Sequence, residues 1–241
     1  MSGTRIGLVA DLWRYPVKSF AGERSRHLFV GPYGIQGDRT HAVVSPTGSV
    51  VTVRRASRML NFAARHADPE ASRGVLVTTP DGTELPVDDP ALGPALTAEL
   101  DRDAQLARSP VGVFDAAPLH IVTDASVRQV AEWSGRDLDT RRFRPNIVVE
   151  LEVPDPFAEA AWVGGFVAFG EGAVAGIVSP TERCAVTTLD PDTLERDNTV
   201  LANLANRLDN LFGVYAEVAR PGWVRVGDPV VLIPSQDTPS G

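Results

Sequence analysis

The sequence has little cysteine: Cys184 is the only one among 241 residues. A single thiol cannot form an intramolecular disulfide, which excludes a small secreted fold held by disulfides. It also cannot supply the several thiolates that ligate an iron–sulfur cluster. If the protein carries out redox chemistry, its electrons must therefore come from a separate partner.

Long hydrophobic runs and an excess of positive charge are also missing. No stretch approaches the ~18 apolar residues of a membrane-spanning helix. The apolar run at residues 6–10 is too short for the core of a secretory signal. The formal net charge of -8 disfavours general binding to nucleic acids or anionic membranes. We therefore expect a cytoplasmic protein that binds neither nucleic acid nor membrane.

Several enzyme motifs are absent as well. The sequence contains no nucleophile elbow, no Walker A loop and no His-Glu-x-x-His motif. Gly170-Glu171-Gly172 followed by Gly176 resembles a nucleotide-binding glycine loop, but a strand-like segment follows it instead of the required helix. The histidines have no metal-ligand spacing, and we interpret each as a surface or core residue: His27, His41, His66 and His120.

The composition indicates a globular protein with a packed core, since hydrophobic residues make up 43% and charged residues 22% of the sequence. Short strands are predicted along most of the chain, including segments 50–53, 75–79 and 84–87. Helices are predicted at 93–107, 124–133 and 200–211, and residues 58–67 fit either a helix or a strand. This pattern favours a mainly β or α+β, barrel-like fold.

A weak boundary is placed near residue 110, where Ser109-Pro110 precedes a second set of elements. We predict one domain over residues 1–110, a second over 111–235, and a flexible tail at 236–241.

The surroundings of Cys184 give it chemical interest. A lone cysteine is most often a small buried hydrophobe. Here loop-forming residues follow a predicted strand, and Arg183 stands directly before the thiol. A nearby cation favours the thiolate, which is the metal-binding and nucleophilic form. Thiolates suit redox metals that prefer soft ligands.

Basic residues recur at the ends of predicted strands. Lys18 and Ser19 follow one strand, Arg39 lies in a turn, and Arg54 ends another strand. Three arginines at 141, 142 and 144 precede a further strand. Each alone reads as a solvated surface charge, but together, in an acidic protein, they indicate an anionic ligand, since guanidinium binds phosphate bidentately.

These segments resemble the MOSC family, named for the C-terminal domain of molybdenum cofactor sulfurase, and are most similar to the mitochondrial amidoxime reducing component and its bacterial relatives. The resemblance runs from about residue 12 to 233. Its specificity lies in the order and spacing of the matching segments, which are 15–19, 37–39, 52–54, 143–146, 183–184, 187–193, 211–215 and 226–230.

The resemblance implies an N-terminal β-barrel-like domain followed by a MOSC β-barrel with a few peripheral helices. It also implies a molybdenum cofactor (Mo-molybdopterin) with Cys184 as the metal ligand and catalytic residue. The expected activity is reduction of small N-hydroxylated substrates, with electrons from a separate ferredoxin or flavin reductase type of donor protein. The residues implied in cofactor binding are Lys18, Ser19, Arg39, Arg54, Arg144, Asn146, Arg183 and Tyr215.

The sequence departs from the family pattern in two places. Ala116 and Ala117 stand where relatives with a reductase role often carry hydroxyl residues, so side-chain hydrogen bonds to the cofactor are lost there. Glu182 places a carboxylate beside an anionic cofactor, which is unfavourable unless it points away or pairs with Arg183. Two other hypotheses remain: a carrier that holds a persulfide on Cys184 or delivers cofactor without turnover, and a relative that has lost the cofactor.

Overall fold

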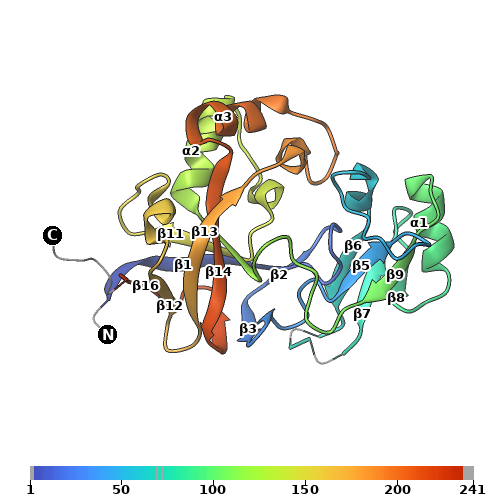
Figure 1. Ribbon diagram of the computed structural model, residues 1–241, viewed down its shortest axis with the longest axis horizontal. Helices are drawn as coiled ribbons and strands as arrows, with labels where there is room; N and C mark the ends of the chain where they lie inside the picture. Colours follow the sequence, from blue (N-terminus) through green and yellow to red (C-terminus); the bar gives the residue numbers. More distant parts are fainter. Residues whose placement is uncertain (1–2, 69, 72, 236–241) are drawn as a thin grey trace.

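The computed structural model describes residues 3–68, 70–71 and 73–235. The predicted flexible tail at 236–241 lies outside them. The mainly β architecture predicted from the sequence is confirmed (Figure 1). Within the described ranges, none of the helices combines the length and the apolar character needed to span a bilayer.

The larger part of the molecule is a closed β-barrel of seven strands. In ladder order the strands are β11 (Ile147–Leu151), β10 (Leu119–Thr123), β14 (Leu211–Arg220), β13 (Val174–Glu182), β12 (Phe166–Phe169), β16 (Pro229–Ile233) and β1 (Thr4–Arg14). The N-terminal strand β1 closes the barrel, because it pairs with β16 on one side and β11 on the other. Only the β10–β11 pair is parallel among the barrel pairings. Beyond β1 the sheet ends with β2 (Glu23–Ser25).

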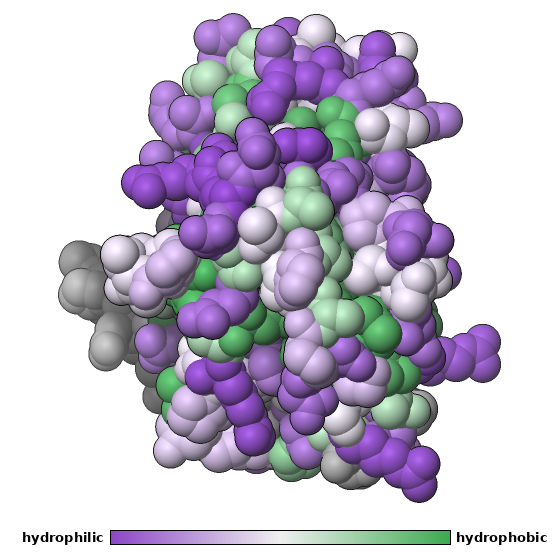
Figure 2. Space-filling view, turned by 90° about the vertical axis from the view of Figure 1, so that its right-hand side faces the viewer, coloured by the Kyte–Doolittle hydropathy of each residue, from purple (hydrophilic) through white to green (hydrophobic). Residues whose placement is uncertain are grey.

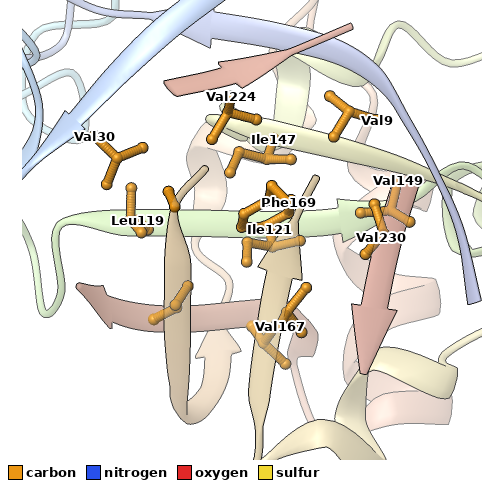
Figure 3. Close-up of a cluster of buried hydrophobic side chains, with 14 of the residues drawn as sticks. Val9, Val30, Leu119, Ile121, Ile147, Val149, Val167, Phe169, Val224 and Val230 are labelled. Carbon is orange, nitrogen blue, oxygen red and sulfur yellow. The ribbon is translucent and has the colours of Figure 1, made fainter. Parts of the chain in front are cut away.

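The barrel interior is filled by aliphatic and aromatic side chains. Successive residues of a strand point to opposite faces, so alternate residues such as Val167 and Phe169 of β12 reach the core. Figure 3 shows them converging with Ile121, Ile147 and Val230 from other strands. Burying each such side chain contributes about 1.5–3 kcal/mol, so the barrel is a packed scaffold.

The smaller part of the molecule lies beside the barrel and has its own core, which includes Phe20, Phe62 and Leu96 (Figure 1). Its outer face is mostly hydrophilic with small apolar patches (Figure 2). Its elements are β5 (His41–Val44) paired with β9 (Gln105–Arg108), the sheet β6 (Ala63–His66), β7 (Val75–Thr78) and β8 (Glu84–Pro86), η1 (Ser57–Asn61) and α1 (Leu92–Leu100). A third small sheet consists of β15 (Gly222–Arg225), β3 (His27–Gly31) and β4 (Gly34–Ile35).

Two helices pack against each other on the outside of the barrel, α2 (Asp124–Ser134) and α3 (Asn198–Leu208) (Figure 1). Thr123 caps α2 by accepting a hydrogen bond from the Ser126 amide, and Gly135 ends it in the left-handed conformation. The helices predicted at 124–133 and 200–211 are thus confirmed within a few residues. Three short 3-10 segments complete the fold: η2 (Thr140–Phe143), η3 (Ala158–Trp162) and η4 (Ala185–Thr188).

Other sequence expectations were wrong in detail. The helix predicted at 93–107 ends at Leu100, because Asp101 is left-handed and residues 105–108 form β9 against β5. The expected strand 50–53 forms only an isolated bridge, between Val50 and Val44. Residues 58–67 hold both alternatives in succession, since η1 is followed by β6. Pairing between distant segments overrides the local preference at these places.

Candidate functional site

One pocket of about 320 Å³ is lined by all nine residues selected from the sequence. We call it the main pocket. Loops between strands supply most of its wall, which explains how residues so far apart in the chain meet. It is lined by Lys18, Ser19, Arg39, Thr52, Val53, Arg54, Phe114, Asp115, Ala116, Ala117, His120, Phe143, Arg144, Asn146, Glu182, Arg183, Cys184, Val186 and Tyr215. A narrow cavity of about 30 Å³ adjoins it, sharing Arg144 and Val186.

Lys18 is a buried cation at the wall of the main pocket, with its side chain 9% exposed. Its Nζ donates to the Val113 carbonyl at 3.0 Å and to Asp115 Oδ1 at 2.7 Å. Arg54, which is exposed, reaches the same Asp115 oxygen at 3.3 Å. Burial lowers the pKa of Lys18, while Asp115 opposes that effect. Burial raises the pKa of Asp115, but Lys18 and Arg54 outweigh it, so the net pKa is below the ordinary value.

Tyr15 holds two arginines of the main pocket against its ring. The guanidinium carbons of Arg144 and Arg39 lie 4.3 and 4.9 Å from the ring centroid, which are cation–π distances. Burial raises the pKa of Tyr15 to about 12 and lowers that of Arg144 to about 10. Arg144 donates through Nη1 to the Phe20 carbonyl at 2.8 Å. Its buried Nη2 has no hydrogen-bond partner among the described residues.

Asp38 is a buried carboxylate behind the pocket wall that organises several of its groups. Its Oδ1 accepts from the Tyr15 amide at 2.6 Å, and its Oδ2 accepts from Asn146 Nδ2 at 3.2 Å and from Arg39 Nη1. Asn146 also accepts through Oδ1 from the His120 amide at 3.2 Å and donates to the Trp13 carbonyl at 3.2 Å. Because both ends of its amide are occupied, Asn146 fixes the wall of the pocket.

His120 connects two arginine-bearing segments from a buried position. Arg183 Nη1 lies 3.4 Å from its Nε2, and the Arg144 carbonyl lies 3.4 Å from its Nδ1. Arginine can only donate, so Nε2 accepts and Nδ1 carries the proton. Burial, followed by the charge of Arg183, holds the pKa of His120 well below its usual value, which leaves the ring neutral. The Tyr215 ring packs beside it at 5.6 Å.

Cys184 lies where β13 ends and η4 begins, and it is half-buried in the wall of the main pocket. Its carbonyl accepts from the Thr187 amide at 3.1 Å and from Thr187 Oγ1 at 3.0 Å, which fixes the backbone beside the thiol. The neighbouring Arg183 donates to the Phe143 carbonyl at 2.7 Å, and its buried Nε has no hydrogen-bond partner in the described part of the chain. Burial lowers the pKa of Arg183.

The remaining selected residues also line the pocket. Ser19 has a positive φ of 72° and accepts a hydrogen bond from the Val53 amide at 3.1 Å, which ties the segment after β1 to the loop that carries Arg54. Tyr215 of β14 is half-buried, and desolvation raises its pKa. Glu182 is exposed, and no ion pair with Arg183 occurs in residues 73–235.

The charges of the main pocket favour an anionic ligand. Its cations are Lys18, Arg39, Arg54, Arg144 and Arg183, while its only carboxylates among the described residues are Asp115 and Glu182. Across residues 3–68, 70–71 and 73–235, no three or more His, Cys, Asp or Glu side chains gather in a metal-binding cluster. The thiol of Cys184 is the one soft donor atom among the residues that line the pocket.

Together these features define a β-barrel protein with a cationic pocket that contains one thiol. The chain belongs to the MOSC domain family: the MOSC domain matches residues 108–231, and the MOSC N-terminal beta barrel domain matches residues 6–109. This confirms the family resemblance read from the sequence. The division near residue 110 stays a prediction of domain structure, since β1 from the N-terminal segment is itself a strand of the barrel.

Relatives cover nearly the whole chain. The chain is 26% identical to mitochondrial amidoxime-reducing component 1 of Mus musculus, over 95% of its own length and 83% of that protein. It is also 26% identical to mitochondrial amidoxime reducing component 2 of Homo sapiens, over 94% and 83%. The YUAD protein from Bacillus subtilis has a similar fold, with a TM-score of 0.52 at 16% identity, covering 98% of this chain and 100% of that one.

Sequence reasoning missed four residues that shape the site. Tyr15 and Asp38 stand inside segments that it singled out, but nothing marked them as supports for the arginines. Asp115 directly precedes Ala116 and Ala117, and only these two alanines drew attention in the sequence. His120 was interpreted only as a surface or core residue, because the sequence does not show which residues a buried histidine contacts.

Proposed function

We propose that the protein is a molybdenum-cofactor-dependent oxidoreductase that reduces N-hydroxylated small molecules with electrons from a separate donor protein. The observation that carries the proposal is the shared location of Cys184 with Lys18, Arg39, Arg144 and Arg183 in one pocket. A thiolate suits a soft redox metal, and the cations suit a phosphate. The names of the relatives, which refer to amidoxime reduction, support the substrate class.

The residues of the main pocket fit this cofactor. Arg144 Nη2 and Arg183 Nε are buried donors that lack a hydrogen-bond partner among the described residues. A buried unsatisfied donor costs about 1–3 kcal/mol, and an anionic ligand would relieve that cost. Cys184 would hold the metal. The pterin and its phosphate would be held by Lys18, Ser19, Arg39, Arg54, Arg183, Arg144 and Tyr215, with Asn146 shaping the wall.

When bound, the cofactor supplies a centre for two-electron reduction of an N–O bond, which consumes two electrons and two protons and releases water. The chain contributes orientation and electrostatics. Cys184 presents its sulfur from a backbone fixed by Thr187. Neutral His120 holds Arg183 beside the thiol. The electrons must arrive from outside, because a single cysteine cannot ligate an iron–sulfur cluster. The electron donor is expected to be of the ferredoxin or flavin reductase type, in the cytoplasm.

The test is expression with cofactor supply, followed by molybdenum and pterin analysis and an amidoxime reduction assay with a reduced viologen dye as electron donor. We expect bound molybdenum and turnover in the parent protein. Cys184→Ser should keep the melting temperature and lose turnover. Ser179→Ala, on the strand β13 that precedes Cys184 and outside the main pocket, is the matched control and should keep both the melting temperature and turnover.

Two results would contradict the proposal. Retained turnover in Cys184→Ser would remove the cysteine from the mechanism. Absence of molybdenum and pterin after cofactor supply would remove the cofactor. Mass spectrometry of the same samples distinguishes a sulfur carrier from a molybdenum enzyme, because a persulfide on Cys184 without bound metal would indicate a carrier.

A further inference from the structure

A carboxylate, that of Asp115, contacts two cations of the main pocket in the free protein. Asp115 Oδ1 lies 2.7 Å from Lys18 Nζ and 3.3 Å from Arg54 Nη2. Lys18 is nearly buried, whereas the side chains of Asp115 and Arg54 are both about half exposed, at 53% and 52%. Asp115 therefore reaches in from the accessible side of the pocket to neutralise a cation in its wall.

The two cations belong to a different part of the chain from Asp115. Lys18 follows β1 and Arg54 precedes η1, while Asp115 lies between β9 and β10 on the segment that leads into the second half of the barrel. The Val113 carbonyl on that segment also accepts from Lys18. An ammonium group has three donors, so the protein uses two of the three on this one segment.

We propose that Asp115 sets how tightly the main pocket holds a phosphate-bearing ligand, because its carboxylate occupies Lys18 and Arg54 in the free protein and must share or release them when the phosphate binds. The inference rests on the proposed function for the nature of the ligand. It makes Asp115 a built-in counter-ion that keeps a buried lysine charged before the ligand arrives. The other carboxylate of the pocket, Glu182, has no ion pair with Lys18 or Arg54 in residues 3–68 and 73–235.

If this is correct, removing the charge of Asp115 should lower the stability of the free protein and raise its affinity for phosphate. Removing the Asp115 charge leaves Lys18 buried beside a neutral partner, which destabilises the free protein. The same change frees both cations for the ligand and removes the repulsion between a carboxylate and a phosphate. Phosphate should therefore bind more tightly to the variant, and it should restore more of the lost stability than it adds to the parent protein.

The experiment uses the full chain prepared without cofactor, with inorganic phosphate as the probe. Binding is measured by titration calorimetry at fixed ionic strength, and melting temperature is measured with and without phosphate. For Asp115→Asn we expect phosphate to bind about fivefold more tightly, the upper end of the scale for one half-exposed charge contact. Glu217→Gln, which removes an exposed carboxylate of β14 outside the main pocket, is the matched control, and its phosphate affinity should change by less than about twofold because its charge is screened from the pocket cations.

Several outcomes would overturn the inference. They are equal or weaker phosphate binding by Asp115→Asn, an equal gain in affinity in Glu217→Gln, and no phosphate binding by any form. If Asp115→Asn does not fold, Asp115→Ser gives the same measurement with a shorter neutral side chain. The metal and pterin content of protein made with cofactor supply is measured separately, so failure of the molybdenum proposal and failure of this one are distinguishable.

Discussion

Replacing His120 by glutamine should change how the stability of the protein depends on pH. Glutamine can still accept from Arg183 and donate to the Arg144 carbonyl, but it does not titrate. In the folded protein, burial and then Arg183 hold the pKa of His120 well below its usual value. In the unfolded chain the same group titrates at about 6.5. The unfolded state therefore binds more protons in the interval below about pH 6.5.

The sign of the effect follows from proton linkage. Stability rises with pH wherever the unfolded state binds more protons. His120 therefore does not lower the free energy of unfolding above about pH 6.5. Below that pH it lowers the free energy of unfolding increasingly, until the pH reaches its pKa in the folded protein. One proton difference corresponds to a slope of about 1.4 kcal/mol per pH unit. Below about pH 6.5, His120 should thus remove stability with a slope of at most about 1.4 kcal/mol per pH unit, and this loss ends where the pH reaches the lowered pKa of the folded protein.

The assay is urea unfolding of cofactor-free protein at several pH values between about 4.5 and 7.5. We expect the free energy of unfolding of His120→Gln to fall less steeply with acid than that of the parent, by about one proton's slope. Burial also lowers the pKa of His41, so His41→Gln should remove a second contribution at a separate place in the fold. If the free energies of unfolding of the parent and of His120→Gln change with pH in parallel, the claim that a neutral buried imidazole supports Arg183 is refuted.

Two further substitutions test the supports behind the pocket. Asp38→Asn should lower the free energy of unfolding by about 3–5 kcal/mol, since it leaves Arg39 without its buried charged partner. Chemical denaturation measures this loss, and a loss below about 1 kcal/mol would contradict the role of Asp38. Gly213→Ala should lower the free energy of unfolding by more than about 1 kcal/mol, because the backbone φ is +74° and the new Cβ would lie 2.7 Å from His120 Nε2. An unchanged melting temperature would contradict this prediction and show that the strand can move away from His120.

The fold could be predicted from the sequence where local patterns and long-range pairing agree. The strands predicted at 75–79 and 84–87 occur as β7 and β8, which pair across the Asp81-Gly82 turn, and the helix predicted at 124–133 occurs as α2, capped by Thr123 and Gly135. Prediction failed where a distant partner decides the outcome. Residues 105–108 read as a continuation of a helix rich in alanine and leucine, and only β5, more than sixty residues earlier, makes them a strand.

The candidate site could be predicted as a set of residues but not as a network. Charged and nucleophilic side chains in an ordered series of segments are visible in the sequence, which is why Lys18, Arg144 and Cys184 could be selected. Their supports are not visible, because a buried aspartate or histidine is defined by what it contacts. The sequence does not show which arginines contact the Tyr15 ring, nor that Asp38 is buried.

The supports show how an acidic protein keeps several cations together in one pocket. Arg39 and Arg144 repel each other across a small space, and burial lowers the pKa of Arg144 to about 10. The Tyr15 ring that both arginines contact, the Asp38 carboxylate bound to Arg39 and the Asp115 carboxylate on Lys18 each offset part of that repulsion. Buried donors on Arg144 and Arg183 still lack partners among the described residues. A ligand that binds only the folded pocket must raise the free energy of unfolding, by about 2.7 kcal/mol when it is present at 100 times its Kd.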